Sequence, residues 1–127
     1  MNVISISWSK PIRVLPSNRE AIPQAAGVYE ILVQMRGGNR KRLYVGSAEN
    51  LRVRYLQHIQ GDEPNPCLGE NLRRYICWFR FAVVEDERER LDAKRELHAK
   101  YEAEYECNER NPVGSGSVKE ILLLDEE

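Results

Sequence analysis

The sequence predicts a small α/β domain in which a mainly antiparallel sheet of three or more strands is flanked by helices. Three observations support this prediction. Residues 27–35 are rich in β-forming side chains, and a turn cluster separates them from a second β-rich run at residues 41–46. An apolar stripe at helical spacing begins directly afterwards, at Leu51. A third β-rich run, residues 75–84, precedes the longest helical candidate, residues 87–105.

The length and the composition fit one compact domain. A chain of 127 residues has the usual size of a single cooperative core. Hydrophobic residues make up 42% of the chain and charged residues 31%, a globular mixture without an apolar run long enough to cross a bilayer. The first residues carry neither a basic leader nor an apolar run of signal-peptide length. We therefore expect a cytoplasmic protein, with a domain over residues 1–112 and a tail over residues 113–127.

The first two β-rich runs are predicted to form a hairpin. Residues 36–39, Arg-Gly-Gly-Asn, are a turn cluster of the kind that joins antiparallel strands. Alternation with a period of two places four side chains on one face of the first strand: Tyr29, Ile31, Val33 and Met35. In the returning strand, Leu43 and Val45 are expected on the face opposite Tyr44.

A helix is predicted to begin near Leu51, because a side-chain oxygen of Ser47 or Asn50 can accept the free N–H groups of its first turn. Leu51, Tyr55 and Ile59 then repeat every four residues and form an apolar stripe. This helix would follow the hairpin directly.

The remaining segments give weaker signals. Residues 4–15 suit a short edge strand or a lead-in loop, because prolines interrupt them. Residues 68–74 suit a short helix. Residues 114–117, Gly-Ser-Gly-Ser, are typical of a flexible joint. The apolar run at residues 121–124 would either dock back on the domain or contact another chain.

The three cysteines do not predict a disulfide framework or a zinc ribbon. Cys67, Cys77 and Cys107 are odd in number and contain no Cys-x-x-Cys pair. A zinc site that adds His98 to them matches no closed zinc motif. Free buried thiols are therefore expected.

The charges are segregated along the chain, although the net charge is only −1. Residues 36–58 contain six basic residues and one acidic residue, whereas residues 85–109 contain five basic and ten acidic residues. Such a molecule can present one positive face to a polyanion. The alternative is that both segments are ordinary solvated surfaces.

The hairpin and the helix after it carry the most informative pattern. Residues 27–29 read Gly-Val-Tyr, residues 44–46 read Tyr-Val-Gly, and Arg54 and His58 follow one helical turn apart. The stretch YVGSAENLRVRYLQH, together with Glu96 twelve residues before Asn108, resembles the GIY-YIG nuclease family. The resemblance covers about residues 22–112 and implies the GIY-YIG endonuclease fold.

The resemblance also implies roles for the candidate residues. Tyr29 would activate or position the attacking water with help from His58, and Tyr44 would orient the scissile phosphate or share in proton transfer. Which tyrosine deprotonates the water is left open. Arg54 would stabilise the charge on the phosphoryl oxygens. Asn108 would brace the end of the catalytic helix by hydrogen bonds.

A divalent metal ion belongs to the same implied chemistry. Glu96, a single carboxylate on a helix, would bind Mg²⁺ or Mn²⁺, which complete their coordination with water and substrate phosphate. The implied activity is metal-dependent hydrolysis of DNA phosphodiester bonds, with specificity from a partner protein or a homodimer. Ser47 stands where some family members carry a lysine, so one basic contact to the phosphate is missing.

Each candidate residue also has an ordinary structural explanation. Tyr29 and Tyr44 can be strand aromatics, Arg54 and His58 can be surface side chains, and Glu96 can belong to an exposed row of charges. The alternative function is therefore a non-catalytic module that binds nucleic acid or protein on the same scaffold. A purely structural domain is the third possibility.

Overall fold

The computed structural model of the chain describes residues 2–60, 63–108 and 118–125. Its main sheet has four strands in the order β2 (Ile12–Arg13), β5 (Cys77–Val83), β3 (Gly27–Gln34) and β4 (Arg40–Ala48). All neighbouring pairs in this sheet are antiparallel. The predicted fold class is therefore confirmed.

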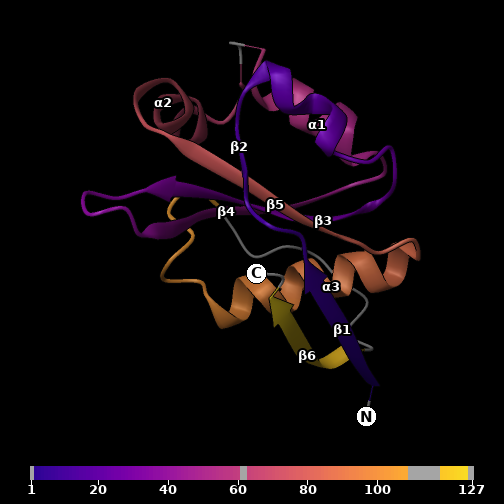
Figure 1. Ribbon diagram of the computed structural model, residues 1–127. Helices are drawn as coiled ribbons and strands as arrows, with labels where there is room; N and C mark the ends of the chain where they lie inside the picture. Colours follow the sequence, from indigo (N-terminus) through magenta and orange to yellow (C-terminus); the bar gives the residue numbers. More distant parts are fainter. Residues whose placement is uncertain (1, 61–62, 109–117, 126–127) are drawn as a thin grey trace.

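Helices cover both faces of this sheet (Figure 1). On one face lie α1 (Leu51–His58) and α2 (Pro66–Arg74), and on the other lies α3 (Glu87–Lys100). The short 3₁₀ helix η1 (Pro16–Ala21) precedes β3. No helix within the described residues has the length and apolar character that a membrane span needs.

The two faces of β3 contribute to two separate hydrophobic cores. Tyr29 and Ile31 belong to the core under α1 and α2, whereas Val28 belongs to the core under α3. A strand that is buried on both faces has a continuous run of β-forming residues in its sequence, and residues 27–35 have such a run.

The hairpin between β3 and β4 forms as predicted, with one irregularity. Gly37 and Gly38 take positive φ angles of 98° and 95° in the turn, which a side chain would disfavour. The pairing then shifts between Ile31 and Leu32, so that Leu43 has no direct partner on β3. The prediction that Leu43 and Val45 share a face is wrong, because this bulge places them in different cores.

The two ends of the described chain lie side by side. Strand β1 (Asn2–Trp8) pairs in parallel with β6 (Val118–Asp125), and both lie on the α3 side of the main sheet (Figure 1). The segment predicted as one edge strand or loop thus forms β1 and β2. The predicted joint at residues 114–117 lies outside the described residues.

Side-chain caps define where the helices begin. Asn50 accepts a hydrogen bond from the backbone N–H of Val53 at 3.1 Å, and Asp86 caps α3 through the N–H of Glu89 at 2.9 Å. The end of α3 differs from the prediction, since the helix stops at Lys100 and not at residue 105. The chain turns there, and Tyr105 reaches back to the sheet.

The expectation of three free thiols is wrong for two of the cysteines. Cys67 and Cys107 form a disulfide bond, and only Cys77 is a free, buried thiol. Their 40-residue separation hides the pairing in the sequence. Cys107 reaches α2 because its backbone N–H bonds the carbonyl oxygen of Leu43 at 3.0 Å, which lays this segment along the outer edge of β4.

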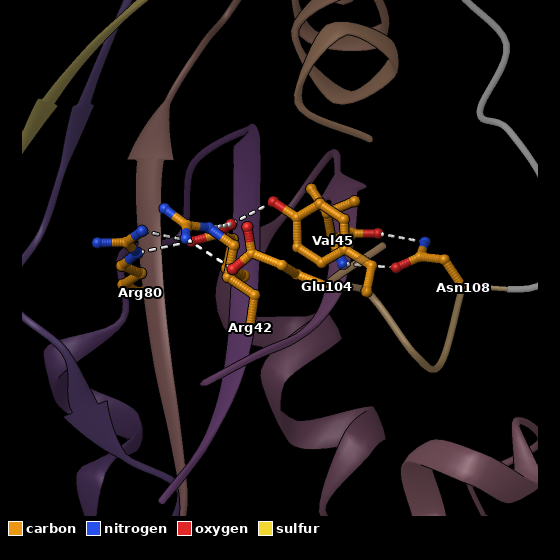
Figure 2. Close-up of polar contacts among 7 residues, drawn as sticks. Arg42, Val45, Arg80, Glu104 and Asn108 are labelled. Carbon is orange, nitrogen blue, oxygen red and sulfur yellow. Dashed lines mark hydrogen bonds and ion pairs between the residues drawn. The ribbon is translucent and has the colours of Figure 1, made fainter. Parts of the chain in front are cut away.

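A buried carboxylate organises the α3 side of the sheet. Glu30 has no exposed surface, and Figure 2 shows the polar contacts around it. Arg42 Nε donates to it at 3.0 Å, Arg80 donates through Nε at 2.7 Å and Nη2 at 2.6 Å, and the hydroxyl of Tyr105 donates a further hydrogen bond. The buried charge is thus paired from two neighbouring strands and from the segment after α3.

Candidate active site

Four of the predicted site residues meet on the α1 side of the sheet. Tyr29 comes from β3 and Tyr44 from β4, where Tyr44 pairs with Ile31, while Arg54 and His58 come from α1. The ring centre of Tyr29 lies 6.2 Å from that of Tyr44 and 5.5 Å from that of His58, and Tyr44 and His58 are 5.9 Å apart. Arg54 lies near the Tyr29 hydroxyl, whose pKa its positive charge lowers. The structure therefore gathers these four residues into one cluster.

The two glycines of the pattern make room for this cluster. A Cβ atom on Gly46 would lie 2.4 Å from Cζ and Oη of Tyr29, so the tyrosine ring crosses β4 only where a side chain is missing. A Cβ atom on Gly27 would lie 2.2 Å from the carbonyl oxygen of Ala82 on β5. Both glycines are needed for close approach.

A continuous chain of hydrogen bonds runs through the cluster. The hydroxyl of Tyr29 is 2.7 Å from Nε2 of His58, and Nδ1 of His58 is 2.6 Å from Oε2 of Glu63. A carboxylate accepts only, so Nδ1–H donates to Glu63 and the lone pair of Nε2 is free to accept the proton of Tyr29. Glu63 thus selects the tautomer that makes His58 a base toward Tyr29.

Glu63 was missed by the sequence analysis. It follows α1 in a connecting segment, five residues after His58, and no motif marks it. Its side chain is only 8% exposed, and Oε1 also accepts a hydrogen bond from the backbone of Asn65 at 3.3 Å. Glu63 lies after α1 and directly before Pro64, and in the sequence only its charge distinguishes it.

The environment of Tyr29 keeps its proton in place. Burial raises the pKa of Tyr29 well above its usual value of 10.0, and the negative charges of Tyr44 and Glu63, when ionised, raise it further. Arg54 acts in the opposite direction through its charge and its hydrogen bond. Tyr29 is therefore a neutral phenol near pH 7, and any loss of its proton needs His58 as the acceptor.

The His58 imidazole is expected to stay neutral at pH values where a free histidine would already be protonated. Burial lowers the pKa of His58 from 6.5, and the positive charge of Arg54 lowers it further, although Glu63 opposes both effects. Because the folded-state pKa lies below the unfolded value, the stability that neutral His58 contributes is present above pH 6.5 and is lost as the pH falls through the folded-state pKa. An NMR titration of the His58 ring should give a midpoint below 6.5.

A second measurement checks the sign of this effect. The wild type should lose more stability toward urea than His58→Gln between about pH 7.5 and about pH 5, since the variant lacks the titrating ring. A midpoint at or above 6.5, or equal losses in both proteins, would contradict the expected direction.

The prediction that Asn108 braces the end of the catalytic helix is wrong. Asn108 instead braces β4. Its Oδ1 accepts from the backbone N–H of Val45 at 2.9 Å, and its Nδ2 donates to the carbonyl of Val45 at 3.0 Å (Figure 2). The helix ends at Lys100, so Asn108 lies beyond it and along the free edge of the strand. It thus fixes the strand segment between Tyr44 and Gly46.

Glu96 makes no described contact with the cluster. Ala93 and Leu97 form the buried stripe of α3, and the 100° step of a helix places Glu96 on one flank of this stripe and Lys94 on the other. Burial lowers the pKa of Lys94, and the positive charge of Arg54 lowers it further. Glu96 makes no hydrogen bond or ion pair with any described residue. Its role as a metal ligand stays a prediction.

Mg²⁺ and Mn²⁺ need oxygen ligands, carboxylates above all. Among the described residues, no group of three or more metal-binding side chains comes together. Glu63, the carboxylate that contacts the cluster, already bonds His58 and Asn65. An ion held by one carboxylate would therefore depend on water and substrate phosphate to complete its coordination.

An open cavity of about 430 Å³ adjoins the cluster, between α1 and the first half of α3. Arg54 and Gln57 line it from α1, and Glu87, Arg90 and Leu91 line it from α3. Much of the predicted positive charge lies elsewhere, since Arg42 is bonded to Glu30 and Lys41 to Glu106. The cavity itself is lined by two cations, Arg54 and Arg90, and by two carboxylates, Glu49 and Glu87.

Comparison with known proteins identifies the fold. No known family profile matches the sequence, and no curated protein does. A solved structure of the GIY-YIG N-terminal endonuclease domain of UvrC from Thermotoga maritima, bound to magnesium as its catalytic divalent cation, superposes with a TM-score of 0.52 at 22% identity. The match covers 72% of this chain and 92% of that one.

A tyrosine-to-phenylalanine point mutant of the same Thermotoga maritima domain, also bound to its catalytic divalent cation, gives a TM-score of 0.53 at 23% identity. It covers 76% of this chain and 99% of that one. Since almost the whole of the solved domain is matched, the chain has the GIY-YIG endonuclease fold, as the sequence pattern predicted.

Proposed function

We propose that this chain hydrolyses phosphodiester bonds of DNA at the cluster of Tyr29, His58 and Arg54. The observation that carries the proposal is the hydrogen-bond chain from Tyr29 through His58 to Glu63, with the Arg54 guanidinium beside the phenol. A base that is held in the correct tautomer next to a phosphate-binding arginine is suited to activate water for in-line attack.

The proposed reaction begins with water beside the Tyr29 hydroxyl. As the water oxygen bonds to phosphorus, its proton passes to the Tyr29 oxygen and the phenolic proton passes to Nε2 of His58, which leaves an imidazolium next to Glu63. The phosphorus–O3′ bond breaks, and the leaving oxygen takes a proton from solvent. Arg54 offers its donors to the phosphoryl oxygens, on which negative charge builds up.

Tyr44 has a different part in this proposal. It is half-buried and lies beside both Tyr29 and His58, and the hydroxyl of Tyr29 lies 2.7 Å from Nε2 of the imidazole. Tyr29 is therefore proposed as the proton-transferring tyrosine, and Tyr44 as the one that orients the phosphate.

One observation favours a second candidate function. Arg54 lines an open cavity, and it forms no ion pair with a carboxylate among the residues that the structure describes. A guanidinium in this position is suited to bind a phosphate without cleaving it. The second candidate is thus a DNA-binding module on the nuclease scaffold.

Incubation of supercoiled plasmid with the purified protein in Mg²⁺, Mn²⁺ or EDTA separates the two functions. Metal-dependent nicking by wild type, lost in Tyr29→Phe, Arg54→Ala and Glu96→Gln, is the expected result. Nicking that Glu96→Gln and EDTA leave intact would contradict the metal-binding role of Glu96. Absence of cleavage with plasmid, branched DNA, single-stranded DNA and RNA would overturn the nuclease proposal and favour the binding module.

A further inference from the structure

The disulfide bond between Cys67 and Cys107 connects two elements that hold residues of the site. Cys67 lies in the first turn of α2, and Cys107 lies beside the outer edge of β4. Tyr44 belongs to β4, and Glu63 belongs to the segment that leads into α2. The bond therefore joins the strand that holds Tyr44 to the segment that holds Glu63.

On the β4 side, the strand is held at both neighbours of Tyr44. The backbone N–H of Cys107 donates to the carbonyl oxygen of Leu43 at 3.0 Å. The side chain of Asn108 bonds both backbone groups of Val45, at 2.9 and 3.0 Å. Tyr44 is the residue between Leu43 and Val45, so the segment that the disulfide fixes also fixes the backbone that carries the Tyr44 ring.

On the α2 side, Asn65 connects the disulfide to Glu63. Nδ2 of Asn65 donates to the carbonyl oxygen of Cys107 at 2.7 Å, and its backbone N–H donates to Oε1 of Glu63 at 3.3 Å. Oδ1 of Asn65 accepts from the backbone N–H of Leu68 at 3.2 Å and so caps α2. Oε2 of Glu63 bonds His58. A continuous row of contacts thus runs from the disulfide to the imidazole.

The two bonded cysteines differ in their access to solvent. Cys107 is only 1% exposed, whereas Cys67 is half-buried. A thiolate of a small dithiol can therefore attack the sulfur of Cys67. The S–S bond breaks, and Cys107 leaves as a thiolate that takes up a proton. The second thiolate of the dithiol then attacks the mixed disulfide and releases Cys67, so that the dithiol is oxidised to a disulfide and the protein is reduced to two thiols.

The third cysteine does not compete for this bond. Cys77 is only 4% exposed, and burial raises its pKa to about 11, so its thiol stays protonated near pH 7. The thiol donates to the carbonyl oxygen of Asn71 at 3.5 Å. Because the thiolate is the form that attacks a disulfide, oxidation of the reduced chain should restore the pair of Cys67 and Cys107.

We propose that the Cys67–Cys107 disulfide positions Tyr44 and Glu63 for DNA cleavage, so that the activity of this site depends on the oxidation state of the two cysteines. The inference rests on the proposed function and deepens it. In the reduced chain, the hydrogen bonds on both sides of the bond lose their covalent support, and Tyr44 and Glu63 gain freedom to move. In the reducing interior of a cell such a bond forms only under oxidising conditions, so oxidation would activate the site.

The test compares oxidised wild type with wild type reduced by dithiothreitol, at a temperature where far-ultraviolet circular dichroism shows both forms folded. Thiol titration in denaturant verifies one free thiol in the oxidised form and three in the reduced form. Reduction should slow plasmid nicking by about 10²-fold, the loss that a misplacement of about 1 Å can cause. Removal of the reductant and reoxidation should restore the rate.

Two NMR measurements do not depend on cleavage. Hydrogen exchange of the Val45 amide, which donates to Asn108, should become at least about tenfold faster on reduction, because its local opening becomes easier. The nitrogen shifts of the His58 ring should move away from those of a single tautomer, because Glu63 is held less firmly. A disulfide that only stabilised the fold would leave the His58 shifts unchanged as long as the protein is folded.

Cys67→Ala and Cys77→Ala are the matched pair of variants. Cys67→Ala cannot form the bond, so it should nick at the rate of reduced wild type with or without dithiothreitol. Cys77→Ala keeps the bond and should respond to dithiothreitol as wild type does. The circular-dichroism melting curve of each variant verifies that it folds.

Equal rates of nicking by oxidised and reduced wild type would overturn the inference, as would a response to dithiothreitol that persists in Cys67→Ala. If neither form cuts DNA, the proposed function fails. The His58 shifts then decide the positioning role of the disulfide: a change on reduction supports it, and no change overturns it.

Discussion

Replacing Glu30 with alanine is expected to lower the free energy of unfolding by about 3–5 kcal/mol, the usual loss when one partner of a buried ion pair is removed. Glu30 has no exposed surface and receives hydrogen bonds from Arg42, Arg80 and Tyr105. Its removal leaves two guanidinium groups whose side chains are only 23% and 12% exposed, without the carboxylate that compensates for their burial. Urea unfolding followed by circular dichroism measures the loss.

Glu106→Ala is a suitable control for this experiment. Glu106 also pairs with a cation, Lys41, but both side chains are exposed, at 52% and 37%. Such a surface pair is worth at most about 1 kcal/mol, because water screens it. Similar losses in Glu30→Ala and Glu106→Ala would show that the buried cluster does not stabilise the sheet as described.

Replacing Glu63 with glutamine is expected to slow DNA cleavage by about 10²–10⁴-fold, the range for loss of general base catalysis. The amide of glutamine can donate to Nδ1 of His58, which then holds its proton on Nε2. That tautomer cannot accept the proton of Tyr29. Glu63 does not touch the reacting atoms in the proposed reaction, so it is a positioning residue that acts through His58.

Nitrogen chemical shifts of the His58 ring distinguish this role from a general loss of structure. Wild type should show the proton on Nδ1 at neutral pH, and Glu63→Gln should show it on Nε2 and a lower His58 pKa, since the carboxylate that raises the pKa is gone. Glu63→Asp should keep the wild-type tautomer. A glutamine variant with the wild-type tautomer, or with unchanged cleavage despite the altered tautomer, would contradict the assigned role.

Local chemistry made part of the fold predictable. The turn glycines, the Asn50 cap and the apolar stripe of α1 act over a few residues, and the structure has each of them. The Tyr29, Tyr44, Arg54 and His58 cluster was also predictable, because the hairpin and the helix after it fix these residues within one continuous segment.

Long-range pairing could not be predicted in the same way. The bond between Cys67 and Cys107 depends on how residues after α3 return along β4. The same return explains the error in the predicted end of the helix, because α3 stops at Lys100 and a turn follows it.

Glu30 also protects the alignment of β3 with its neighbours. Because β3 is buried on both faces, its apolar residues would tolerate a slip by one position, which exchanges the two faces of a strand. Such a slip would turn Glu30 into the apolar core beneath α1 and move the Tyr29 phenol to the Arg42 and Arg80 side. The slipped hairpin would then bury the Glu30 carboxylate away from the two guanidinium groups that pair with it. A variant in which apolar residues replace Glu30, Arg42 and Arg80 could keep the stability of the protein. It would still lose the single alignment of β3 that places Tyr29 beside His58.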